Sequence, residues 1–163
     1  MTMDGTKNSK AKPLAALLLL VFLSSATSSQ VFPELNGIAL KGVEKVDARF
    51  VVLNWLNVQL NIDDFRTNGQ SALELALRRD GVVVDPSAPN YLICYVFASE
   101  PQPGIVSYTN LIEFYEYSIT DVHRLQWRSG GASTVGRNGF DAGTVARTCS
   151  DSFVGEWLKQ NPK

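Results

Sequence analysis

The sequence predicts an α+β fold, a two-layer sandwich in which two helices cover one face of a mainly antiparallel sheet of four to six strands. Runs of alternating or continuous apolar residues, rich in β-branched and aromatic side chains, recur between residues 50 and 135. Two other segments, one before Gly81 and one near the carboxyl terminus, repeat apolar residues every three or four positions. The expected element order is therefore β-α-β-β-β-β-α.

The first strand is expected between residues 50 and 62. Its alternation of apolar residues changes parity partway along, and a bulge or bend near Trp55 would reconcile the two halves. A helix follows, because apolar residues then recur at helical spacing. Asp63 or Asp64 is the expected amino-terminal cap, and Gly81 suits the carboxyl-terminal end.

The middle of the chain alternates between strands and turns. Further strands are expected at residues 82–84, 91–98, 105–119 and 122–127. Residues 85–90 and 99–104 contain prolines, which cannot donate to a β-ladder, and are expected to be turns. The stretch SGGAS (129–133) is expected to turn the chain out of the last strand. The final helix begins at Asp141, and its buried side repeats Val145, Cys149, Phe153 and Trp157.

Residues 1–26 have the pattern of a secretory signal peptide. Three lysines precede the apolar run LAALLLLVFL (14–23), and small residues follow it. A membrane span needs about 20 apolar residues, so cleavage after Ala26 is expected, with Ser29 as the alternative site and an uncleaved anchor as the alternative fate. Residues 27–45 are then an irregular lead-in and residues 46–163 a single α+β domain. The expected location is periplasmic or secreted.

The charge balance limits the classes of partner. The chain has 15 Lys and Arg and 16 Asp and Glu, and three of the lysines and one aspartate precede residue 27. The exported part therefore has a net charge of −3, which argues against nonspecific binding to nucleic acid. It lacks a cysteine near the cleavage zone that could accept a lipid. No stable membrane span is expected after cleavage.

The two cysteines, Cys94 and Cys149, fall in a predicted strand and the last predicted helix. Export places them in an oxidising compartment, where an even number of cysteines permits a disulfide. They meet if that helix packs on that strand. A disulfide and a pair of buried thiols both fit the sequence.

No residue pattern indicates catalysis. His123 is the only histidine, and a partly exposed histidine at a strand edge explains it more simply than a catalytic relay. A zinc site lacks any familiar spacing. The glycine-rich stretch 130–139 lacks the Lys-Ser/Thr pair of a phosphate loop. We expect no enzyme, metal or cofactor; the alternative is a small periplasmic hydrolase or anion-binding enzyme that uses residues 130–139 and His123.

The strand at residues 91–98 is apolar on both faces. Leu92, Cys94 and Val96 are suited to packing under helices, which leaves the opposite face for another partner. That face and its neighbour on the long strand carry the expected partner-binding residues Tyr91, Ile93, Tyr95, Phe97, Tyr115 and Tyr117. The expected partner is an unknown envelope protein or a second copy of this chain. The alternative is that the lead-in or the twist of the sheet covers this face.

Four motifs carry a family resemblance. They are LRRDG (77–81), YLICYV (91–96), WRSGGASTVG (127–136) and FVGEWLKQNPK (153–163). In this order they resemble an uncharacterised family of small exported bacterial α+β proteins, which is loosely similar to periplasmic modules such as the amino-terminal domain of the translocation protein TolB. The resemblance implies a non-catalytic docking or assembly role in the cell envelope, and it implies no catalytic residue.

Overall fold

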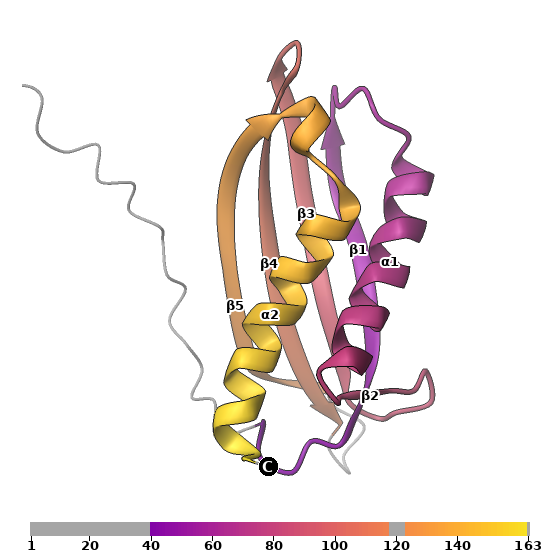
Figure 1. Cartoon of the computed structure of the whole chain (residues 1–163), viewed down its shortest axis with the longest axis vertical. Helices are drawn as coiled ribbons and strands as arrows, with labels where there is room; N and C mark the ends of the chain where they lie inside the picture. The colour runs from indigo at the N-terminus through magenta and orange to yellow at the C-terminus, as the bar shows by residue number, and fades with distance from the viewer. Residues whose placement is uncertain (1–39, 118–122, 163) are drawn as a thin grey trace, which may run out of the picture.

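The computed structural model describes residues 40–117 and 123–162, which form a sheet with two helices packed on one of its faces (Figure 1). The predicted signal peptide and most of the predicted lead-in lie outside the described residues. The elements are β1 (Lys45–Leu56), α1 (Ile62–Arg79), β2 (Val83–Val84), β3 (Tyr91–Gln102), β4 (Ile105–Tyr117), β5 (His123–Gly136), the short 3₁₀ helix η2 (Arg137–Gly139) and α2 (Ala142–Gln160). The predicted α+β class and element order are confirmed.

The sheet is mixed, with strand order β2-β1-β3-β4-β5. β1 lies between β2 and β3 and runs parallel to both, whereas β3, β4 and β5 form an antiparallel meander. α1 packs mainly on β1 and on α2, and α2 also reaches β4. Both helices lie in front of the sheet in Figure 1, so the other face carries no helix of the described part of the chain.

The first strand ends earlier than its apolar alternation predicts. The predicted bulge is present, because the pairing with β3 shifts register between Val52 and Asn54. The strand then stops at Leu56, and Asn57 adopts a positive φ of 59°. The expected continuation to Ile62 is wrong, because Ile62 is already the first residue of α1. Of the apolar residues after Leu56, Val58 is buried without belonging to a strand.

The cap of α1 is Asn61 and not Asp63 or Asp64. Its side-chain oxygen accepts hydrogen bonds from the backbone nitrogens of Asp63 at 2.9 Å and Asp64 at 3.2 Å. The two aspartates occupy the first turn, where their charge favours the positive end of the helix. Asparagine is as good a cap as aspartate, so the sequence alone does not distinguish the three positions.

The stretch SGGAS does not turn but continues β5, which is one strand from His123 to Gly136. A β-carbon at Gly130 would lie 2.7 Å from the backbone oxygen of Asn110 on β4. Gly130 therefore permits a close approach of two strands, which is a recognised use of glycine within a sheet. The prediction of a hairpin turn here is wrong. Glycine is favoured both in turns and where two strands approach closely, so its presence does not distinguish them.

The core lies between the helices and the sheet and contains the predicted cysteine pair. Cys94 on β3 and Cys149 on α2 are fully buried and joined by a disulfide, with their Cα atoms 6.0 Å apart. Phe114 of β4 and Phe153 of α2 pack nearby with ring centroids 5.9 Å apart. The last helix begins where predicted, and Asp141 is its amino-terminal cap, accepting a hydrogen bond from the backbone nitrogen of Thr144.

The chain before β1 is tied to the end of α2. The Trp157 indole donates to the Val43 carbonyl at 2.7 Å, and the Asn161 side-chain amide donates to the Leu40 carbonyl at 2.8 Å. Leu40 and Val43 are buried in the core. Residues 40–45, the part of the expected lead-in that the structure describes, therefore pack against the domain. Within residues 40–117 and 123–162, no helix is long and apolar enough to cross a membrane.

Candidate functional site: the open face of the sheet

We use the name open face for the side of the sheet opposite α1 and α2. Strand parity places Leu92, Cys94 and Val96 under the helices, where all three are fully buried. The alternate residues of β3 project to the open face, and Tyr91, Tyr95 and Phe97 are half-buried there. The structure thus places the predicted docking residues of β3 on the side expected from the sequence.

Ile93 differs from its neighbours on the open face because it is only 7% exposed. Its partners across the strands are Arg49 on β1 and Glu113 on β4. Larger side chains on both adjoining strands therefore surround it. Ile93 contributes to the packing of the open face and not to its exposed surface.

An aromatic cluster occupies the end of the open face where β3 begins. Tyr91 stacks on Tyr115 with ring centroids 4.8 Å apart, and the guanidinium of Arg49 lies 4.9 Å from the Tyr91 ring centroid. His123 meets the ring of Tyr91 at 4.6 Å and that of Tyr117 at 5.4 Å, edge-on in both cases. The five residues come from four strands, β1, β3, β4 and β5. We call these five residues the aromatic cluster.

Glu113 links the aromatic cluster to the middle of the open face. The Tyr115 hydroxyl donates a hydrogen bond to its carboxylate at 2.6 Å. Burial, followed by this bond to Glu113, raises the pKa of Tyr115 far above its ordinary value. Burial and the Glu113 charge also raise the pKa of Tyr95. Both phenols therefore remain protonated at neutral pH and act as hydrogen-bonding groups with apolar rings.

A groove of about 610 Å³ lies toward the other end of the sheet, where β3 turns into β4. Phe97 belongs to its lining, so the groove adjoins the predicted docking residues. Most other lining side chains are small or polar and are cross-strand partners on the open face. The lining residues are Asn54, Leu56, Phe97, Ala98, Ser99, Ser107, Tyr108, Thr109, Ala132, Ser133 and Thr134.

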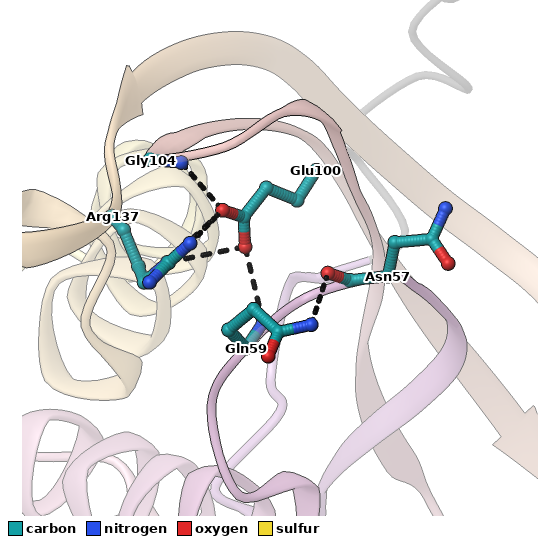
Figure 2. Close-up of polar contacts among 5 residues, drawn as sticks. All are labelled: Asn57, Gln59, Glu100, Gly104 and Arg137. Carbon is teal, nitrogen blue, oxygen red and sulfur yellow. Dashed lines mark hydrogen bonds and ion pairs between the residues drawn. The ribbon is translucent and has the colours of Figure 1, made fainter.

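A buried carboxylate at the β3–β4 hairpin forms a network of polar contacts (Figure 2). The side chain of Glu100 is 2% exposed and forms an ion pair with Arg137. One carboxylate oxygen accepts from the Gly104 backbone nitrogen at 2.6 Å and the other from the Gln59 backbone nitrogen at 3.1 Å. Figure 2 also shows the Gln59 side chain bonded to the carbonyl of Asn57. We call the group formed by Glu100, Arg137, Gly104 and Gln59 the Glu100 clasp.

The Glu100 clasp joins three connections that are far apart in the chain: the β1–α1 loop, the β3–β4 hairpin and the start of η2. The hydrogen bonds from Arg137 and from the backbone of Gly104 lower the pKa of Glu100 to about 2. A carboxylate with so low a pKa is a poor proton acceptor at neutral pH. Its role in this geometry is to hold these three connections together.

The residues of the alternative enzyme site are not brought together. His123 begins β5, whereas residues 130–136 continue it and Arg137 opens η2. A strand rises about 3.3 Å per residue, so the two ends of β5 are roughly 40 Å apart. His123 instead belongs to the aromatic cluster. Within the described residues there is no group of three or more His, Cys, Asp or Glu side chains that could hold a metal ion.

The groove and the Glu100 clasp were not predicted from the sequence. Glu100 lies in the stretch SEPQPG, whose prolines and glycine are typical of a turn and give no sign of a buried carboxylate. Its partner Arg137 is 37 positions away. The alternation of Ser107 and Thr109 with larger residues marks a strand face lined by small side chains, but only the observed register brings these residues beside Ala132 and Thr134.

No family model and no curated protein matches the chain. Among solved structures, a substituted PelC dodecamer from Paraburkholderia phytofirmans has a TM-score of 0.41 and 15% identity, covering 69% of this chain and 91% of that one. Another PelC dodecamer from the same organism has a TM-score of 0.41 and 14% identity, covering 68% and 87%. This is a remote likeness of fold, and no conclusion about function is drawn from it.

Proposed function

We propose that this chain is an exported, non-catalytic binding domain of the bacterial cell envelope, and that it binds a partner protein through the open face. The observation that carries the proposal is the continuity of that face. Half-exposed aromatic residues run from the aromatic cluster through Tyr95 to Phe97, and Phe97 opens into the groove. Tyrosine is enriched at protein interfaces because its ring is apolar while its hydroxyl keeps a polar partner.

The chemistry of the polar groups supports binding over catalysis. A catalytic acid or base needs a pKa near the working pH. The pKa of Glu100 is shifted down to about 2, and those of Tyr95 and Tyr115 are shifted upward. These shifts move all three groups away from neutrality. Each group also has a hydrogen-bonding role within the fold.

Export is supported by two independent features. Residues 1–26 have the basic, apolar and small-residue regions of a signal peptide. The disulfide between Cys94 and Cys149 is of the kind that persists in the periplasm and outside the cell. The resemblance to small exported envelope proteins and to the TolB amino-terminal domain is consistent with a periplasmic or secreted docking module.

Photo-crosslinking in cells tests the proposal. A benzophenone amino acid replaces Phe97 on the open face in one variant and Leu75 on α1, which is 70% exposed, in the control. We expect a discrete adduct from position 97 in the envelope fraction, none from position 75, and loss of the adduct when Tyr95→Ala and Tyr115→Ala are added. An adduct from position 75 alone, or unchanged crosslinking in the tyrosine double variant, would contradict a role for the open face.

Fractionation tests the location separately. We expect the mature chain in the periplasm or the medium, shortened by about 26 residues as measured by mass spectrometry. Recovery of the full-length chain in the cytoplasm would contradict export while leaving the crosslinking result meaningful.

A further inference from the structure

The two edges of the sheet are built differently. The β2 edge is two residues long, and Pro86 and Pro89 follow it closely. The β5 edge extends over 14 residues and contains no proline or lysine. Native proteins usually shorten an exposed edge or interrupt it with proline, lysine or a bulge, because its unpaired backbone groups are a template for another strand. The β5 edge has one register shift near its start, opposite Phe114 and Tyr115, but from Trp127 to Gly136 it contains no bulge, proline or lysine.

The hydrogen-bond pattern identifies which backbone groups of β5 point outward. The backbone nitrogen of Arg137 donates to the carbonyl of Gly104 at 2.8 Å, in the same register that pairs Gly136 with Ile105. In an antiparallel pair, directly opposite residues that exchange such bonds alternate with residues whose backbone groups face away. Counting back from Arg137, the backbone N–H and C=O groups of odd-numbered residues point toward β4. Those of Gly130, Ala132 and Thr134 point outward, away from the sheet.

These outward groups have no partner within the described residues. No hydrogen bond joins the backbone N–H of Gly130, Ala132 or Thr134 to residues 40–117 or 123–162 outside the β4 ladder. The side chains from Ser129 to Gly136 are small or medium in size and uncharged. Nothing on this stretch therefore blocks the approach of another strand, either by bulk or by charge.

We propose that a second copy of this chain pairs with the first along the β5 edge, antiparallel and about a two-fold axis near Gly131. This goes beyond the proposed function, because it concerns the edge of the sheet and not the open face. Two identical edges match in length and in the spacing of their outward groups, as an isologous interface requires. A two-fold axis between Gly130 and Ala132 places even-numbered residues of one copy opposite even-numbered residues of the other. The outward N–H groups of each copy therefore meet the outward C=O groups of its partner.

The charges are compatible with this arrangement. With the axis at Gly131, Arg128 of one copy lies opposite Thr134 of the other, and moving the axis by one residue to either side places it opposite Ala132 or Gly136. No arginine then faces an arginine. The pairing joins the two five-stranded sheets into one of ten strands, which is within the range of open sheets. A two-fold axis perpendicular to the sheet keeps all four helices on one side and makes the two open faces continuous.

The test compares Ala132→Pro with Ala132→Thr in the purified exported chain. Proline removes an outward N–H without removing a bond to β4, whereas threonine keeps the N–H and favours a strand. Light scattering and sedimentation over a dilution series should show a dimer for the parent and for Ala132→Thr. In Ala132→Pro the dissociation constant should rise by roughly 30-fold, because the symmetric interface loses two hydrogen bonds.

Ala132→Lys provides a second variant in case proline prevents folding, since it places like charges near the axis and leaves the backbone intact. Hydrogen exchange by NMR should show the amides of Gly130 and Thr134 protected in the dimer and rapidly exchanging in Ala132→Lys. A parent that is monomeric at every concentration would overturn the proposal. Protection of the same amides in such a monomer would show that the chain's own preceding segment covers the edge. A dimer unaffected by both variants would place the interface elsewhere.

Discussion

The disulfide between Cys94 and Cys149 should account for a large share of the stability of this domain. It joins the first half of β3 to the middle of α2, and both cysteines are fully buried. The perturbation is the double change Cys94→Ala and Cys149→Ala, which removes the cross-link without placing a polar group in the core.

The expected loss follows from the loop that the bond closes. The two cysteines are 55 positions apart. In the chain-entropy model, cross-linking a loop of this length lowers the entropy of the unfolded chain and stabilises the fold by about 4 kcal/mol at 25 °C. Because natural domains unfold at a cost of only about 5–15 kcal/mol, the double variant should be marginal. Its melting temperature should fall by roughly 15 °C.

The assay is urea unfolding followed by circular dichroism, with and without a thiol reductant. Reductant should lower the midpoint of the parent chain toward that of the double alanine variant, and it should leave the variant unchanged. Mass spectrometry of alkylated, unreduced parent protein should show no reactive thiol. If reductant leaves the parent's midpoint in place, or if two thiols are alkylated without reduction, the reasoning is refuted.

Three further changes test other parts of the structure. Gly130→Ala should destabilise the chain by about 1–3 kcal/mol through its clash with the Asn110 carbonyl, whereas Gly131→Ala, whose β-carbon would lie 3.7 Å from its nearest neighbour, should be close to neutral by thermal melting. Glu100 has a pKa of about 2, below its ordinary value, so its stabilising effect is complete above about pH 4.5 and disappears as the pH falls toward 2. Glu100→Gln should therefore be less stable than the parent at neutral pH and lose less stability on acidification, and parallel slopes from pH 5 to 2 would contradict this. Tyr95→Ala with Tyr115→Ala should lower the melting temperature by a few degrees, whereas Phe114→Ala in the core should cost about 3–5 kcal/mol; equal losses would mean that the open face is core.

Elements with a strong local pattern were predictable from the sequence. The four-residue repeat of α2 correctly identified its buried side. Strand parity placed Tyr91, Tyr95 and Phe97 on the side of the sheet that faces away from the helices. The encounter of Cys94 with Cys149 followed from those two patterns together. In each case the periodicity of a single element decides which of its side chains are buried, so no knowledge of distant partners is needed.

The errors occur where tertiary contacts override a local pattern. The alternation after Leu56 is typical of a strand, yet the cap at Asn61 starts a helix immediately afterwards. Gly130 and Gly131 have the composition of a turn, but both lie within β5, and the small size of Gly130 permits the close approach of β4. The Glu100 clasp depends on a partner 37 positions away, and no local pattern encodes a contact of that range.

The most direct test of the central claim is oxidative footprinting of side chains in intact cells and in purified protein. If a partner covers the open face in the envelope, Tyr95 and Phe97 should be labelled much less in cells than after purification, while Leu75 on α1 should be labelled equally in both. Equal labelling of Tyr95 and Phe97 in the two settings would show that the open face has no partner in the cell and would contradict the proposed function.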